Sequence, residues 1–329
     1  MADFNTRLTQ CFNISHPIVL APMGGASGAK LATAVSRAGG LGLVGASYGD
    51  EQWMRTELAP MRELKQPWGV GLVMFTVARN MALLDLALEY GPNAVALSFG
   101  DPAAFVSIIH RAGAKAIVQI HELDQASAAL DAGADALIVQ GAEAGGHSLR
   151  RGLMPLLPAV QDLVGDKIPL IAAGGIADGR GMAAALMLGA DGVMLGTRFL
   201  ASEEALPSAA YKKRLIKSGT SDTVRTRIFD LVRGIEWPEH YSGRAIANRF
   251  SHAWLGRDEA LRDAPDSIRQ DYAKAVLADD LDNRAIWAGE VLDLVGDIKP
   301  ARQIVHDLLS ETTRILRNSQ QLLALDKIA

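Results

Sequence analysis

The sequence of 329 residues lacks features that several classes of protein require. Its one cysteine, Cys11, excludes an internal disulfide and a metal cluster held by cysteines. The most apolar stretch, 182–200, is interrupted by Asp191 and Arg198, so no charge-free run of about 18 apolar residues offers a membrane-spanning helix. The first residues lack the apolar core of a signal peptide. We therefore expect a cytoplasmic protein that does not enter a membrane.

An excess of positive charge is also missing. The chain has 33 Lys and Arg against 37 Asp and Glu, which gives a formal net charge of −4. Proteins that bind nucleic acids need a basic surface to replace the counterions of the phosphates, so we expect no nucleic-acid partner. Hydrophobic residues make up 49% of the chain and charged residues 21%, which is typical of a folded chain with a large core.

Short apolar segments recur along the first two thirds of the chain. They are rich in Val, Ile and Leu and are apolar at nearly every position, as expected for parallel strands that are covered on both sides. Alanine-rich segments with helical spacing lie between them. The segments that we predict as strands are 17–21, 41–45, 69–74, 94–98, 116–120, 136–140, 169–173 and 192–195.

One local pattern links four of the predicted helices to the next strand. A glycine follows the helix directly at Gly39, Gly113, Gly133 and Gly189, where it supplies the left-handed residue that ends a helix. Eight strand–helix units in about 200 residues predict an α/β fold, and specifically a (β/α)₈ TIM barrel. An open, doubly wound sheet is the alternative, but the even spacing of the units favours a closed barrel.

The composition changes after residue 200. Residues 1–200 are predicted as the barrel, whereas residues 201–285 are more charged, contain Trp237 and Trp254, and show helical patches without buried strands. We expect this segment to be a helical insertion after strand eight that forms a lid. In residues 286–329, apolar side chains at helical spacing, such as Ile304 and Leu308, predict C-terminal helices that close the barrel.

In such a barrel the reactive groups lie at the C-terminal ends of the strands and in the loops that follow. Gly174, Gly175, Gly196 and Thr197 follow strands seven and eight, where barrels commonly bind phosphate through free backbone N–H groups. A Cβ at these positions would keep a phosphate away from the main chain. A tight turn explains any one of these glycines equally well, but two such loops together favour a phosphate site. The first loop, 21–23, is apolar and suits a flat ring.

Two of the seven histidines, His121 and His147, lie on this face of the predicted barrel. His147 is in a loop flanked by glycines, where a packing role is hard to assign, and an imidazole suits proton transfer or the stabilisation of an anion near neutral pH. We predict it as the catalytic residue. His121 is predicted as a packing residue, because that is the usual role of a histidine beside a strand.

Several chemistries are disfavoured on this face. No lysine follows a strand, the carboxylates form no recognisable metal-ligand set, and Cys11 precedes strand one, so we expect no Schiff base, no metal and no catalytic thiol. The glycines at 40, 42 and 45 match a dinucleotide-binding pattern but run through a strand, so we discard it. A phosphate site, an apolar slot and one histidine favour FMN, a phosphate-bearing organic cofactor.

Six motifs carry a resemblance to a known family. They are HPIVLAPM from His16, AVSRAGGLG from Ala34, AEAGGH from Ala142, AAGGIADG from Ala172, LGTRF from Leu195 and IWAG from Ile286. Together they resemble the nitronate monooxygenase family, formerly called 2-nitropropane dioxygenases, over about residues 5–320. FMN-dependent enoyl-ACP reductases and NADH:quinone reductases share the fold and several motifs, but the Ala-Pro-Met-Gly-Gly sequence of the first loop favours the monooxygenase branch.

The resemblance implies an FMN-binding barrel in which His147 is the catalytic residue. Gln119 and Gln140 stand where relatives place side chains near the flavin, although Gln119 replaces the lysine of some quinone-reductase-like members. The other positions that carry over as FMN contacts are Pro22, Met23, Gly24, Gly145, Ala173, Gly174, Gly175, Gly196 and Thr197.

The activity that this resemblance implies is the FMN-dependent oxidation of alkyl nitronates, and also of nitroalkanes, by O₂ to a carbonyl compound and nitrite. An NAD(P)H-dependent FMN reductase of quinones or enoyl thioesters is the alternative, and a non-catalytic flavin or phospholigand binder is a third. Met74, Phe75, Trp237 and Trp254 are candidates to line the substrate pocket, although such residues more often belong to the core. Apolar patches on the surface of the added helices are a candidate interface for a homodimer.

Overall fold

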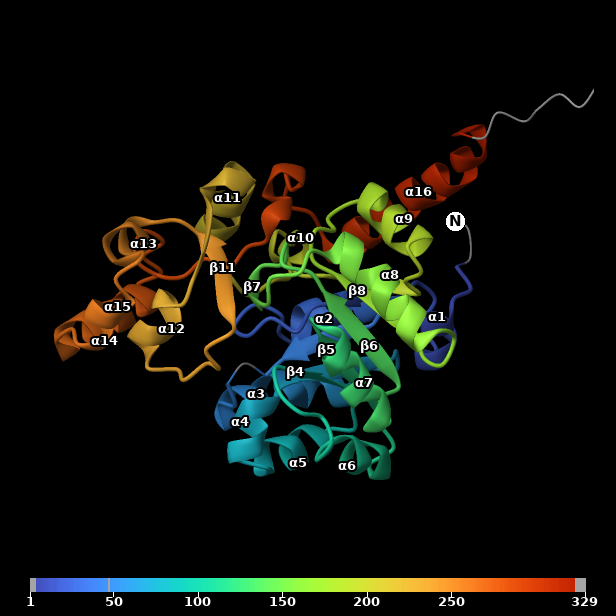
Figure 1. Cartoon of the computed structure of the whole chain (residues 1–329), viewed down its shortest axis with the longest axis horizontal. Helices are drawn as coiled ribbons and strands as arrows, with labels where there is room; N and C mark the ends of the chain where they lie inside the picture. The colour runs from blue at the N-terminus through green and yellow to red at the C-terminus, as the bar shows by residue number, and fades with distance from the viewer. Residues whose placement is uncertain (1–3, 47, 323–329) are drawn as a thin grey trace, which may run out of the picture.

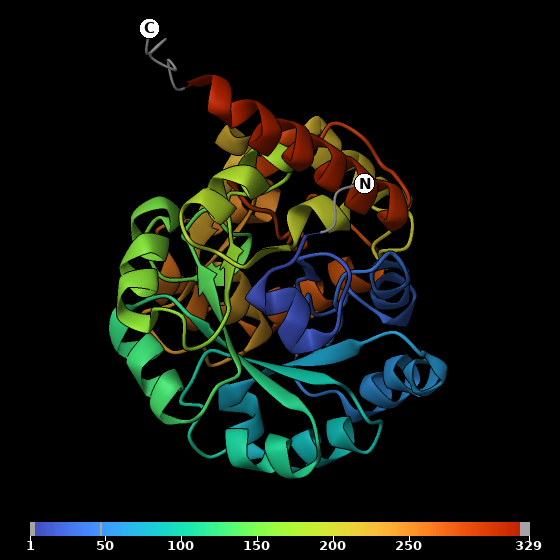
Figure 2. The same cartoon turned by 90° about the vertical axis from the view of Figure 1, so that its right-hand side faces the viewer.

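Eight parallel strands form a closed barrel in the computed structural model, which describes residues 4–46 and 48–322. The strand order is β1-β9-β8-β6-β5-β4-β3-β2, and the ring is closed where Val19 pairs with Leu41. Figure 2 shows the barrel with helices around it. The predicted (β/α)₈ fold is confirmed. The strands are β1 Ile18–Leu20, β2 Gly42–Gly45, β3 Trp68–Val73, β4 Ala94–Ser98, β5 Lys115–Ile120, β6 Ala136–Gln140, β8 Leu170–Ala173 and β9 Gly192–Leu195.

Two apolar layers hold the barrel together. Inward-facing residues such as Leu43, Ile117 and Ile171 fill its interior together with Leu8 and Phe12 of the N-terminal helix α1 (Arg7–Phe12), and all five are buried. The outward-facing residues pack under the surrounding helices. These helices are α2 Ala29–Arg37, α3 Glu51–Leu58, η1 Ala59–Glu63, α4 Met74–Arg79, α5 Ala82–Leu88, α6 Val106–Arg111, α7 Leu123–Asp131, α8 Leu153–Val164, α9 Gly179–Met187 and α10 Thr197–Leu200.

The glycine turns between helices and strands have the predicted geometry. Gly39, Gly113, Gly133 and Gly189 all have a positive φ, between 81° and 101°. A side chain is strained in this left-handed region, which explains why glycine stands where each helix ends and the chain turns into the next strand.

The segment after β9 differs from the prediction in one respect. It is mostly helical, but it also contains two strands, β10 (Thr223–Thr226) and β11 (Ser242–Ile246), which pair antiparallel with β7 (Gly146–Ser148) in the order β10-β11-β7. These strands are short, partly exposed and rich in polar residues, so they lack the apolar pattern of a buried strand. The helices are α11 Ala209–Lys217, η2 Thr220–Asp222, α12 Ile228–Arg233, α13 Arg249–Trp254, α14 Asp258–Arg262 and α15 Asp266–Leu277.

The chain ends on the barrel again. After η3 (Glu290–Leu294), the long helix α16 (Ala301–Asn318) packs against α9 and α2 through a buried face that includes Ile304 and Leu308, and η4 (Ser319–Leu322) follows. Figure 1 shows α11–α15 grouped on one side of the molecule, apart from the helices that surround the barrel. None of the described helices is both long enough and apolar enough to span a bilayer.

Candidate functional site

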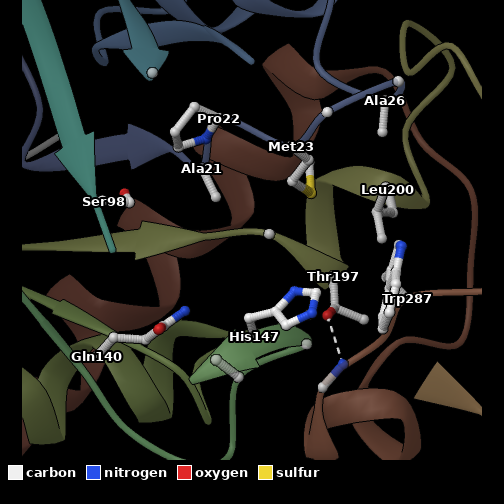
Figure 3. Close-up of a pocket in the computed structure, with 18 of the residues that line it drawn as sticks. Ala21, Pro22, Met23, Ala26, Ser98, Gln140, His147, Thr197, Leu200 and Trp287 are labelled. Atoms are coloured by element: carbon white, nitrogen blue, oxygen red, sulfur yellow. Dashed lines mark hydrogen bonds between the residues drawn. The ribbon is translucent and has the colours of Figure 1, made fainter. Parts of the chain in front are cut away.

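A cavity of about 360 Å³ lies at the C-terminal ends of the barrel strands, between the barrel and the added segment (Figure 3). All the residues that the sequence assigns to catalysis or to FMN line this one cavity. They are Pro22, Met23, Gly24, Gln119, Gln140, Gly145, His147, Ala173, Gly174, Gly175, Gly196 and Thr197.

The loop after β8 forms a cradle that a side chain would fill. Gly174 and Gly175 have φ values of 94° and 72°, and a Cβ on Gly174 would lie 3.0 Å from the carbonyl oxygen of Gly141. Within the described part of the chain, the backbone N–H groups of Gly174, Gly175 and Gly196 donate no hydrogen bond to a protein acceptor. The loops after β8 and β9 line the cavity and therefore offer free donors to an anionic group such as a phosphate.

The first loop lies closely over the neighbouring strands. A Cβ on Gly71 of β3 would lie 2.2 Å from Cβ of Pro22, and a Cβ on Gly45 of β2 would lie 2.6 Å from the carbonyl carbon of Met23. The Met23 amide donates to Oγ of Ser27, at 2.6 Å. The two strand glycines thus make room for the turn, which forms an apolar edge of the cavity. The sequence analysis did not assign a function to either glycine.

The loop that carries His147 packs against the segment after residue 285. A Cβ on Gly145 would lie 2.6 Å from the carbonyl carbon of Ala288, so only glycine allows this contact. The Gly289 amide donates to Oγ1 of Thr197, at 2.9 Å, which ties the same segment to the loop after β9 (Figure 3). The predicted glycine and threonine therefore shape the cavity as well as line it.

His147 is held between an aromatic ring and a carboxylate. It lies on β7, is 7% exposed, and stacks on Trp237 with ring centres 3.5 Å apart and planes 6° apart. Its Nε2 is 2.8 Å from Oδ2 of Asp230 on α12. The second carboxylate oxygen of Asp230 accepts a hydrogen bond from Arg233, at 2.8 Å. The imidazole is therefore one member of a buried histidine–carboxylate–arginine chain.

This environment sets the protonation of His147. Burial lowers its pKa below the usual 6.5, although the hydrogen bond and charge of Asp230 act in the opposite direction. The neutral imidazole then donates its Nε2–H to the carboxylate, which leaves the lone pair on Nδ1. Nδ1 makes no hydrogen bond within residues 4–46 and 48–322. The arrangement gives a neutral imidazole with one nitrogen ready to accept a proton.

Asp230, which is 83 residues from His147, is not among the residues predicted from the sequence. It lies within Ile-Phe-Asp-Leu-Val, residues 228–232. An acidic residue inside such an apolar helical segment is the one feature of the sequence that could have indicated a buried, functional carboxylate. Of the suggested pocket residues, Trp237 lines the cavity and Phe75 contacts Trp237 edge to face, with ring centres 5.0 Å apart. Trp254 lines a separate groove between α13 and α15.

Polar side chains at the ends of three adjacent strands line another part of the cavity. Ser98 of β4 donates to Oε1 of Gln119 of β5, at 3.1 Å. Nε2 of Gln119 donates to Oε1 of Gln140 of β6, at 2.9 Å. Nε2 of His121 also lies 2.7 Å from Oε1 of Gln140. Gln119, whose contacts the resemblance left in doubt, is therefore held by its neighbours in the barrel.

Comparison with known proteins agrees with the earlier resemblance. Residues 5–81 and 71–311 match the sequence profile of the family described as nitronate monooxygenase. A probable nitronate monooxygenase of Staphylococcus aureus is 31% identical over 94% of this chain and 98% of its own length.

Two solved structures are also similar to this chain. FabK from Thermotoga maritima has a TM-score of 0.86 at 30% identity, with 97% of this chain and 99% of that chain covered. Nitroalkane oxidase from Streptomyces ansochromogenes has a TM-score of 0.79 at 29% identity, with 94% and 99% covered. With the family profile spanning most of the chain, the protein belongs to the nitronate monooxygenase family, whose members are flavin-dependent oxidoreductases.

Proposed function

We propose that this protein binds FMN and oxidises alkyl nitronates with O₂ to a carbonyl compound and nitrite. The observation that carries the proposal is the placement of His147. Its imidazole, paired with Asp230, lines the same cavity as the glycine cradle that suits a phosphate. The family and the similarity to a nitroalkane oxidase structure support this activity.

The residues present fit FMN. Gly174, Gly175, Gly196 and Thr197 would hold the phosphate, while Pro22 and Met23 would lie along the ring system. The free N–H groups of the loop glycines and the place of these residues in the wall of the cavity support this assignment. Bound FMN supplies the redox chemistry, for which the side chains of the cavity have no equivalent.

His147 would act on the substrate in one of two protonation states. As a neutral base, Nδ1 takes the α-proton from a nitroalkane, and the resulting imidazolium is stabilised by Asp230. When the substrate enters as a nitronate anion, a protonated His147 places a positive charge beside it. Trp237 stacks on the face of the imidazole and Phe99 meets it edge to face, with ring centres 3.5 Å and 6.4 Å away, and these contacts contribute to the burial of His147.

Nitrite release tests this proposal. Purified protein reconstituted with FMN is mixed aerobically with propionate 3-nitronate, without NADH, and both nitrite and oxygen uptake are measured. We expect nitrite to accumulate as oxygen is consumed. Absence of both, in a protein that has bound FMN, would contradict the proposal.

A second candidate is the NAD(P)H-dependent reduction of quinones or enoyl thioesters. The cavity favours it in one respect, because it extends beyond His147 to Tyr211, Tyr272, Val276 and Arg284, and this length suits a substrate larger than a small nitronate. A reductase would oxidise NADH in the presence of a quinone and release no nitrite from nitronates.

The homodimer, the cytoplasmic location and the boundaries of the insertion stay predictions.

A further inference from the structure

His121 lies behind a chain of hydrogen-bonded side chains in the wall of the cavity. The chain runs from Ser98 through Gln119 to Gln140, and His121 adds a second contact to Oε1 of Gln140. These residues lie at or next to the C-terminal ends of β4, β5 and β6, which are adjacent in the barrel. His121 is predicted from the sequence as a packing residue, but its short contact with Gln140 gives it a polar role.

The surroundings of His121 fix its position. The residue is 1% exposed, its ring stacks on Phe99 with centres 5.7 Å apart, and Tyr241 contacts it at 5.4 Å. Its backbone amide donates to Oε1 of Gln125, at 2.7 Å. Phe99 has a φ of 63°, in the left-handed region that side chains rarely occupy, so the stacking ring is held in place by the surrounding fold. The imidazole therefore has one orientation against Gln140.

The orientation of the amides depends on which nitrogen of His121 carries the proton. With the proton on Nε2, both His121 and Gln119 donate to Oε1 of Gln140, at 2.7 Å and 2.9 Å, and the longer contact of 3.3 Å between Nε2 of Gln119 and Nε2 of His121 is not a hydrogen bond. With the proton on Nδ1, Nε2 becomes an acceptor, and the amides of Gln140 and Gln119 must both turn over.

The unpartnered nitrogen decides between these two arrangements. Within the described residues, Nδ1 of His121 is buried and has no hydrogen-bond partner. A buried N–H without an acceptor is rarer and less favourable than a buried lone pair without a donor. The proton therefore belongs on Nε2. Burial also lowers the pKa of His121 to about 4, which keeps the ring neutral at neutral pH.

One consequence concerns Gln140. Its side-chain oxygen accepts hydrogen bonds from His121 and Gln119. Its amide nitrogen makes no hydrogen bond to a described residue, and the side chain lines the cavity (Figure 3). We propose that His121 is a positioning residue that holds the amide of Gln140 with its NH₂ group toward the cavity, where it donates to an acceptor atom of the bound flavin ring. The binding of FMN in this statement rests on the proposed function.

Such a donor affects the flavin in two measurable ways. A hydrogen bond to a ring acceptor adds to the affinity for FMN, and it favours the reduced ring, which carries more electron density on its acceptor atoms. If His121 acted through packing alone, its replacement by a ring of similar size would leave both properties unchanged.

The first test reads the tautomer directly. The FMN-loaded wild-type protein is labelled with ¹⁵N-histidine, its imidazole signals are recorded at pH 7, and the signals of His121 are identified by their absence in His121→Gln. We expect a neutral ring with its proton on Nε2. A proton on Nδ1, or a doubly protonated ring, would overturn the proposal. This measurement does not depend on activity.

The second test compares two variants of His121. His121→Phe keeps the ring against Phe99 but removes the donor, so we expect FMN affinity to fall about fivefold to tenfold, since a neutral hydrogen bond contributes about 1 kcal/mol. We also expect a lower midpoint potential and a shifted visible band for the flavin. His121→Gln, whose amide supplies a donor, should restore affinity to within about twofold.

A matched control separates the donor from its surroundings. Tyr241→Phe keeps the ring contact with His121 and removes the hydroxyl that accepts from Gln125, at 3.2 Å, without touching Gln140. We expect it to leave the midpoint potential unchanged. A folded His121→Phe protein with wild-type affinity and potential would overturn the proposal, as would an equal shift in Tyr241→Phe. If the wild-type protein bound no FMN, the proposed function would fail and the flavin contact with it, while the tautomer would still decide the orientation of Gln140.

Discussion

The barrel and the segment 201–285 form the two sides of one cavity, and they contribute different kinds of groups. The barrel supplies glycines, free backbone N–H groups and a row of amides at the ends of its strands. The added segment supplies charged and aromatic side chains, among them Asp230, Arg233 and Trp237. His147 is at the boundary, because its strand β7 pairs with β11 of the added segment.

Because their groups differ, we expect the two regions to have different roles in the site. Backbone donors and glycines bind a cofactor in a way that many reactions can use, so we propose the barrel side as the flavin site. The side chains of the added segment surround His147, so we propose that they determine the reaction. Variants that change kcat without changing FMN affinity, or FMN affinity without changing kcat, test this difference between the two regions.

The largest effect is expected for His147→Ala. Loss of the only imidazole that we place on the substrate should lower kcat with a neutral nitroalkane, whose α-proton a base must remove, by about 10³-fold, within the usual range for a general acid–base group. FMN content should stay near that of the wild type, because the glycine cradle is untouched. Steady-state nitrite assays and the visible spectrum of the purified variant measure both. Full turnover would contradict the role of His147.

Asp230→Asn tests the added segment alone. The amide keeps the shape of Asp230 but removes the charge that raises the pKa of His147, so we expect a loss in kcat of about 10²-fold. With a neutral nitroalkane, His147 acts as a base, which is active when it is neutral, so activity falls as the pH drops through its pKa. In the wild type this loss lies below pH 6.5, and in the variant it should move to still lower pH.

Asp282→Asn is the control, because Asp282 is a half-exposed carboxylate in the same segment that pairs with Arg249 and Arg214. It should change neither kcat nor the pH profile. A shift of the acid limb to higher pH in Asp230→Asn would show that the carboxylate does not stabilise the protonated imidazole.

Gly175→Ala tests the barrel side. A side chain at φ 72° is strained, and its Cβ would lie 3.4 Å from Cβ of Glu143, so the free N–H of the loop should shift and FMN affinity should fall by roughly tenfold or more, as expected when a charged hydrogen bond is lost. Gly113→Ala is a matched control: its φ is 81°, and no atom lies within 4 Å of the added Cβ. Both variants should lose about 1–2 kcal/mol of unfolding free energy. Isothermal titration with FMN should separate them, and equal affinities would contradict the cradle.

The smallest effect is expected for Trp237→Phe. A phenyl ring retains part of the stack on His147 but loses the N–H that donates to Tyr48, at 3.0 Å. We expect kcat to fall by about twofold to fivefold, in line with the modest energy of one aromatic contact. FMN affinity should not change. A larger loss of affinity than of kcat would place Trp237 with the cofactor instead of with the imidazole.

The same two regions differ in how well their sequence predicts their structure. The buried parallel strands have continuous apolar sequences, and each glycine turn has a local cause, so the barrel and the cavity-lining residues could be located. The strands β10 and β11 are short and polar, and the pairing of His147 with Asp230 joins residues 83 positions apart. The tautomer of His121 likewise depends on neighbours from three strands. Such contacts come from tertiary packing and leave no periodic pattern in the sequence.

The central claim is that a flavin in this cavity reacts with nitronates beside His147. The most direct test is an anaerobic visible spectrum of the purified protein, titrated with propionate 3-nitronate and, in a separate cuvette, with NADH. We predict a yellow protein whose flavin spectrum changes with the nitronate and not with NADH. Rapid bleaching by NADH, with no response to the nitronate, would contradict the claim and assign the same cavity to a reductase.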